Sequence, residues 1–113
     1  MWDLEERTAV FAESVRQFVR DVPRTVSNQE DVRQLVRASG SVAANCIEAN
    51  EALGSKDRIM KFRISRKEAK ESGLWLRLLY LAGDENSEKT REALRQEAHE
   101  LKLIFTSIIK KLE

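Results

Sequence analysis

Hydrophobic residues recur at intervals of three and four along most of the chain, which is the period of one face of an α-helix. The first such stretch runs from about Asp3 to Asp21, and Pro23 ends it because proline disfavours helix at the residue before it. Strand-forming residues do not gather in alternating runs. The apolar face of this first predicted helix consists of Leu4, Thr8, Phe11, Val15, Phe18 and Val22.

The second predicted helix begins at Ser27, which stands three residues before Glu30 as in a capping box. Gly54 is its expected C-terminal stop. The middle of the stretch is rich in small residues, which predicts close approach of a neighbouring helix. Its apolar face consists of Val32, Leu35, Val36, Ser39, Val42, Ala43, Cys46 and Leu53.

The third predicted helix has Ser55 as its N-cap and runs to about Ala82, before Gly83. Beyond Ser72 it is apolar almost all round. A helix that is apolar on two faces has to be buried on both, and three other helices can cover only one. We therefore expect a second copy of the chain to cover the other face. The candidate interface residues are Ile59, Ile64, Leu74, Trp75 and Leu78.

The fourth predicted helix starts near Ser87 and carries one long apolar stripe. Short connections make successive helices antiparallel neighbours. The pattern therefore predicts an all-α fold, an antiparallel up-down-up-down four-helix bundle, as one domain over residues 1–113. The stripe of the last helix consists of Leu94, Ala98, Leu101, Ile104, Phe105, Ile108, Ile109 and Leu112.

Composition narrows the function classes. Twenty Lys and Arg residues stand against nineteen Asp and Glu residues in a chain of 113, so no global polyanion partner is implied. Cys46 is the only cysteine, which excludes an internal disulfide and favours a cytoplasmic setting. The acidic N-terminus is unlike a secretory signal, and no apolar run approaches the ~20 residues that span a bilayer. We expect no membrane partner.

Catalytic and metal-binding patterns do not stand out. A di-iron bundle needs Glu-x-x-His pairs on two helices, but His99 is the only histidine and Gln96 precedes it by three. Cys46 lies on an apolar stripe, where a thiol packs as a small hydrophobe and its pKa is raised. No glycine-rich phosphate loop occurs. The sequence therefore predicts a protein that is not an enzyme, with no metal, no cofactor and no small-molecule substrate.

Two polar clusters interrupt the helical pattern. One lies near the end of the second predicted helix and includes Asn45 and Glu48. The other, Lys67, Glu68 and Glu71, lies in the third. They form either an ordinary solvated seam or, if the third helix is buried on both sides, a set that needs partners from the second helix or from another subunit.

The third predicted helix is also basic. Residues 54–83 carry eight positive and three negative charges. A one-sided basic stripe can follow a phosphate backbone, so nucleic-acid contact is one interpretation. A solvated face that balances acidic neighbours is the other. The residues that share one sector of a helical wheel are Lys56, Arg63, Arg66, Lys67, Lys70 and Arg77.

Two segments resemble a known family. Residues 41–49, SVAANCIEA, are similar to its "S-v-x-A-N-I-x-E" stretch, and residues 67–79, KEAKESGLWLRLL, to the "K-E-A-x-E-(S/T)-x-x-W-L-x-L-L" signature of one branch. The family is the four-helix-bundle protein family, also called the 23S rRNA intervening-sequence protein family. By this resemblance Asn45 and Glu48 match the first motif. Lys67, Glu68, Glu71, Trp75 and Leu76 match the second.

The resemblance implies a small antiparallel four-helix bundle that assembles into a homopentameric ring. Some members are encoded within insertions in ribosomal RNA genes, and a related protein is the accessory variability determinant of diversity-generating retroelements, a basic pentamer that works with nucleic acid. Ala43 stands where many members have Pro, Ala49 where many have Gly, and the net charge is nearly neutral. The expectation is therefore a self-assembling binding or scaffold module. A nucleic-acid-binding accessory protein is the alternative.

Overall fold

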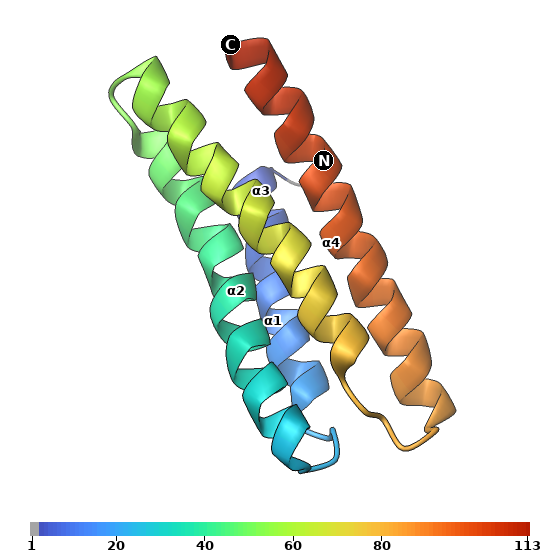
Figure 1. Ribbon diagram of the computed structural model, residues 1–113. Helices are drawn as coiled ribbons and strands as arrows, with labels where there is room; N and C mark the ends of the chain where they lie inside the picture. Colours follow the sequence, from blue (N-terminus) through green and yellow to red (C-terminus); the bar gives the residue numbers. More distant parts are fainter. Residues whose placement is uncertain (1–2) are drawn as a thin grey trace.

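The computed structural model describes residues 3–113, which form four α-helices and no strand. They are α1 (Leu4–Val19), α2 (Val26–Glu51), α3 (Ser55–Leu78) and α4 (Glu85–Leu112), packed side by side (Figure 1). The all-α prediction with four helices is confirmed. Of the acidic N-terminal stretch used in the sequence argument, residues 1 and 2 lie outside the described part.

Side-chain caps fix three of the helix starts. Asp3 Oδ1 accepts a hydrogen bond from the Glu6 amide at 2.8 Å, and Asp84 Oδ2 accepts one from Ser87 at 2.9 Å. The cap of α2 is Thr25, whose hydroxyl accepts from the Asn28 amide at 3.1 Å. Such caps satisfy amide groups that have no partner within the helix. The hydrogen bond from the Ser87 amide favours the ionised form of the Asp84 carboxylate and so lowers its pKa.

Several predicted boundaries were wrong by a few residues. Ser27 is inside α2 rather than its cap, because the hydroxyl of Thr25 reaches the first turn instead. The fourth helix begins at Glu85, after the Asp84 cap, and not at Ser87. Gly54 caps the start of α3 in extended conformation, whereas α2 already ends at Glu51. Leu53, predicted on the apolar face of α2, is therefore fully exposed in the turn.

The third helix ends four residues before the predicted Ala82. The chain leaves α3 after Leu78 in extended conformation and then turns through Ala82 and Gly83, which both have positive φ. This path places the side chains of Leu79 and Leu81 in the core. Part of the apolar run after Ser72 is thus covered within the same chain.

Two polar side chains hold this segment. Asn28 of α2 is 1% exposed, accepts from the Tyr80 amide at 2.9 Å and donates to the Tyr80 carbonyl at 2.8 Å. Arg91 of α4 donates to the carbonyls of Leu76 and Leu79 at the open end of α3. These bonds supply partners to backbone groups that the end of α3 leaves free.

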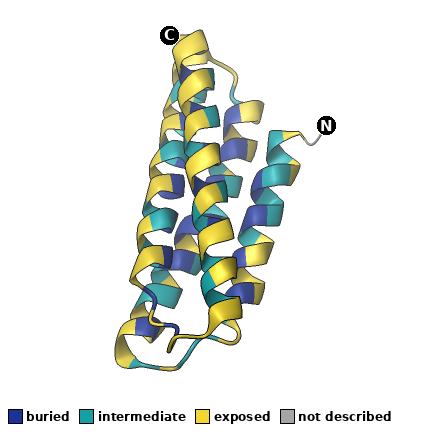
Figure 2. Ribbon diagram, turned by 90° about the vertical axis from the view of Figure 1, so that its right-hand side faces the viewer, coloured by how far each residue is buried: buried dark blue, intermediate teal, exposed yellow. Residues whose placement is uncertain are grey.

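The core lies between the four helices (Figure 2). The apolar stripes predicted for the first and last helices are buried, apart from the partly exposed Leu4, Val22, Ile104, Ile108 and Leu112. Phe62 and Phe105 meet at its centre with ring centroids 6.0 Å apart. The pattern of three- and four-residue steps was therefore sufficient to locate most of the interior.

Contacts between pairs of helices show which helices are neighbours. Helix α2 packs on α1 and α3, and α4 packs on α3 and α1. Arg7 of α1 donates to both carboxylate oxygens of Glu97 of α4 at 2.8 Å. These hydrogen bonds raise the pKa of the Arg7 guanidinium. Hydrogen bonds join Arg58 to Ala49 and Ser65 to Val42, so later residues of α3 face earlier residues of α2.

Candidate functional site

The predicted polar cluster does not come together as one site. Asn45 donates only to Ser41 of its own helix, at 2.9 and 3.0 Å. Glu48 pairs instead with Lys61 of α3 at 3.2 Å. The remaining members lie on α3: Lys67 is exposed, Glu71 is half-buried and Glu68 is buried. The five residues are thus distributed over separate contacts, and only Glu48 and Glu68 pair between α2 and α3.

Glu68 differs from the rest of that cluster. It is 5% exposed, and its Oε2 lies 3.8 Å from the guanidinium of Arg37 on α2. Its other oxygen has no hydrogen-bond partner within residues 3–113, and neither does the indole nitrogen of Trp75 two turns further along. A buried polar atom without a partner costs free energy. The seam beside α2 therefore carries a small stability deficit.

The candidate oligomer interface divides into two groups. Ile59 and Trp75 are partly buried and pack against the core of their own chain, and Ile64 is half-buried. Leu74 and Leu78 are 45% and 50% exposed. The structure adds a residue that the sequence argument missed, Met60, which is 52% exposed. The signal was present, because Met60 lies four residues before Ile64.

Together these residues define what we call the outer row of α3. Its six positions follow each other at steps of four and three, so they lie on one line along the helix. Apolar side chains occupy both ends and a Lys–Glu pair the middle. The outer row consists of Met60, Ile64, Lys67, Glu71, Leu74 and Leu78.

The basic stripe of α3 lies largely in solvent. Arg63 pairs with Glu113 at 3.3 Å, and Arg66 is half-buried. Among the ion pairs of residues 3–113, none includes one of the four other exposed members, which are Lys56, Lys67, Lys70 and Arg77. Cations without a carboxylate neighbour keep their full attraction for an external anion.

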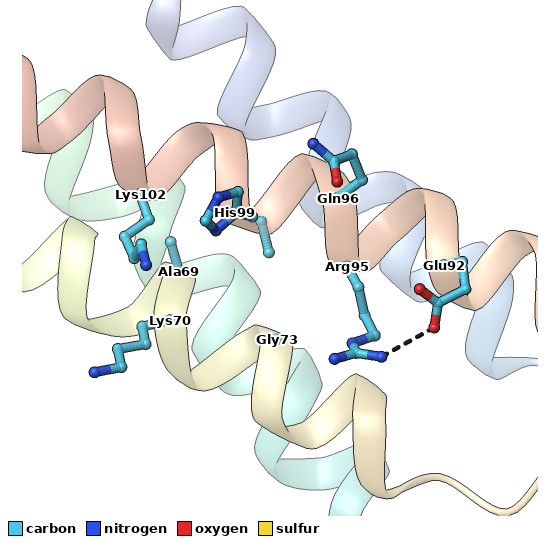
Figure 3. A pocket seen from close by; sticks show the side chains of 9 residues that line it. Ala69, Lys70, Gly73, Glu92, Arg95, Gln96, His99 and Lys102 are labelled. Carbon is cyan, nitrogen blue, oxygen red and sulfur yellow. Dashed lines mark hydrogen bonds and ion pairs between the residues drawn. The ribbon is translucent and has the colours of Figure 1, made fainter.

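A groove lies between α3 and α4 beside this stripe (Figure 3). Its volume is about 310 Å³. From α4, the side chains of Arg95 and Lys102 extend towards α3, and His99 lies between them along α4. None of the residues Arg95, His99 and Lys102 was predicted as a site residue, because the hydrophobic pattern does not fix which residues of α4 face Lys70. The groove is lined by Ala69, Lys70, Gly73, Glu92, Arg95, Gln96, Ala98, His99 and Lys102.

Two other hollows lie at the helix turns. One, of about 510 Å³, surrounds the turn from α2 to α3 and is acidic, with Glu48, Glu51 and Asp57 against Lys61. The other, of about 320 Å³, lies at the turn from α1 to α2. In residues 3–113 no three or more His, Cys, Asp or Glu side chains are arranged to hold a metal ion.

Cys46 lies in the core of α2 and is fully buried. Burial is the main cause that raises the pKa of its thiol to about 11, and the nearby charge of Glu5 adds to it. The thiolate is the reactive form of cysteine, so this side chain is inert at neutral pH. It packs as a small hydrophobe, as the apolar stripe indicated.

Comparisons with known proteins decide the family. The model of the 23S rRNA-intervening sequence protein family matches residues 3–107, nearly the whole chain. The chain belongs to this family. A similar solved structure is that of a protein with unknown function from the S23 ribosomal protein family of Bacteroides thetaiotaomicron VPI-5482. It has 27% sequence identity and a TM-score of 0.77, over 96% of this chain and 99% of the other. No functionally curated protein matches.

Membership in the 23S rRNA-intervening sequence protein family confirms the resemblance drawn from the two motifs. The first motif lies within α2, and the second lies on α3 and ends at the Leu79 cap. The motif of α3 supplies both the buried Glu68 and four of the six residues of the outer row. None of the helices in residues 3–113 is long and apolar enough to cross a membrane.

Proposed function

We propose that this chain is a non-enzymatic subunit that assembles with copies of itself and acts as an oligomeric binding or scaffold module. The resemblance to the family supports helices that run up-down-up-down and five copies that close into a ring. The observation that carries the proposal is the outer row of α3, in which the rest of the chain leaves four of the six side chains exposed.

The outer row has the properties of a protein interface. Met60, Leu74 and Leu78 each expose about half of their side-chain surface. Contiguous apolar side chains in water are unfavourable and mark interaction sites when they gather on one line. Lys67 and Glu71 lie between the apolar pairs and carry opposite charges. A second copy of the chain can therefore offer both apolar surface and charges of the matching sign.

Light scattering on the purified protein tests the assembly. At micromolar concentration we expect a molar mass equal to five copies of the 13.0 kDa chain. A monomer at that concentration would contradict the proposal. Any other defined oligomer would contradict the five-membered ring but would agree with self-association.

Nucleic-acid contact is the second candidate function, and a different observation favours it. Four exposed cations of the basic stripe, among them Lys70 and Arg77, have no carboxylate partner within residues 3–113. The test is a titration with structured RNA and with duplex DNA at several salt concentrations. Phosphate contacts are strongest at low salt, so the absence of binding at about 50 mM salt would remove this candidate.

A further inference from the structure

The groove between α3 and α4 has a floor of small residues and walls of long polar ones. Ala69 and Gly73 of α3 and Ala98 of α4 form the floor. A Cβ atom built on Gly73 would meet nothing within 4 Å, so the space above the helix is open there. Ala69 and Ala98 are buried beneath this space, so an ion can approach the backbone of α3 beside Gly73.

The walls of the groove are basic. Three permanent cations, Lys70, Arg95 and Lys102, line it against a single carboxylate, that of Glu92. This carboxylate is held by Arg95 at 2.9 Å (Figure 3). Lys70 and Lys102 take part in no ion pair within residues 3–113. His99 adds a ring nitrogen that can donate a hydrogen bond. The groove therefore offers donors from both helices with positive charge in excess.

We propose that the groove between α3 and α4 binds a phosphate group, with Lys70 and Lys102 as its principal charges and His99 and Arg95 as further donors. The hollow at the turn from α2 to α3 provides the contrast, since its three carboxylates would repel the same ion. Of these two hollows, the one between α3 and α4 is the one whose charge suits an anion.

This inference rests on the second function proposed above and gives it a location. The basic stripe of α3 passes the groove, with Arg66 one turn before Lys70 and Arg77 two turns after it. A strand of nucleic acid can therefore continue from the groove along the stripe. The same chemistry fits the phosphates of a free nucleotide, so the two sources have to be separated by experiment.

The test compares two double variants that remove the same charge. Lys70→Glu with Lys102→Glu alters the groove. Lys89→Glu with Lys110→Glu alters two exposed lysines of α4 outside it. Binding of a fluorescent single-stranded RNA of about twenty nucleotides is measured by anisotropy at several salt concentrations. We expect the groove variant to bind about tenfold or more weakly with a shallower salt dependence, and the control variant to lose about threefold or less.

Equal losses in the two variants would overturn the groove and leave general nucleic-acid contact standing. The absence of RNA binding in the unchanged protein would overturn both.

Pyrophosphate and ATP are the ligands of a second experiment, an NMR titration in which the amide resonance of Gly73 is the reporter. Displacement of RNA by these small phosphates assigns the site to a phosphate group of any source, and a Gly73 shift with RNA alone assigns it to a strand. If the Gly73 resonance does not shift with any of these ligands, the proposal is contradicted. Circular dichroism and molar mass should be unchanged in both variants.

Discussion

Helix α3 borders α2 along one side and α4 along the other, and these two seams differ in construction. On the α2 side, small side chains lie in full burial, and the Ser65 hydroxyl donates to the Val42 carbonyl at 3.0 Å. On the α4 side, Phe62 and Phe105 close one stretch, but beside Lys70 and Lys102 the seam opens into a groove. Away from the hollow at the turn between them, the seam of α3 with α2 is sealed, whereas part of its seam with α4 is open.

The difference between the two seams shows that one helix can serve packing on one side and binding on another. Small residues allow close contact and leave no room for solvent, so the seam with α2 supplies stability. Beside the groove, Lys70 and Lys102 take part in no ion pair within residues 3–113, so their charges remain attractive to anions. The outer row lies on the side of α3 away from both seams, where we propose that another copy of the chain binds. Each side of α3 therefore has a different role in the proposed assembly.

The largest expected effect comes from the end of the sealed seam, where Asn28 holds Tyr80. Asn28→Ala removes both bonds to the Tyr80 backbone and leaves buried groups without partners. We expect the free energy of unfolding to fall by about 3 kcal/mol, measured by urea denaturation. Asn45→Ala is the control on the same helix, because Asn45 bonds only within its own helix. A loss of less than about 1 kcal/mol is expected there, and equal losses would refute the role of Asn28.

The next effect tests how tightly the sealed seam is packed. Ser65→Leu adds volume at a fully buried position and breaks the bond to Val42. Overpacking of this kind costs about 2 kcal/mol. The exposed Ser107 of α4 provides the control, where Ser107→Leu should change stability by less than about 0.5 kcal/mol. If Ser65→Leu is tolerated equally well, the two seams do not differ in packing.

A smaller effect concerns the buried carboxylate on the sealed side. Glu68→Met removes an oxygen that has no partner, and Arg37 is 59% exposed and can return to water. Replacing a buried ion pair with an apolar side chain is often stabilising, so we expect a gain of about 1 kcal/mol by thermal or urea unfolding. Glu13→Met, at an exposed position of α1, is the control and should be neutral within about 0.5 kcal/mol. A large loss in Glu68→Met would show that the Arg37 contact supports the fold.

The smallest effect is expected on the open seam. Gly73→Ala adds a methyl group where nothing lies within 4 Å, and alanine is favoured over glycine inside a helix. The free energy of unfolding should rise by about 0.5 to 1 kcal/mol. Added atoms would then stabilise this seam and destabilise the other. Destabilisation by Gly73→Ala would mean that the groove is closed in solution.

The helical period in the sequence predicted the four helices and most of the core, because a repeat of three and four residues identifies a buried face directly. It did not predict where α3 ends. A run of leucines continues past Leu78, but the chain leaves the helix there, and Asn28 and Arg91 supply partners for its backbone. One clue was available: Asn28 lies four residues before Val32 on an otherwise apolar face.

The sequence predicted only the α3 side of the candidate sites. The sequence identified the basic side of α3, including Lys70, since a helical wheel shows it at once. It could not identify Arg95, His99 or Lys102 as the facing residues. Those depend on the register between two helices, which is set by packing across the core and leaves no local pattern.

The central claim is that the outer row of α3 joins copies of the chain. It is tested most directly by the molar mass of two double variants, measured by light scattering over a dilution series. Leu74→Glu with Leu78→Glu changes the outer row, and Val26→Glu with Leu53→Glu changes the two most exposed large apolar residues elsewhere. We predict that the unchanged protein and the second variant keep the mass of five chains and that the first falls to the 13.0 kDa monomer. An oligomer that survives in the first variant would contradict the account.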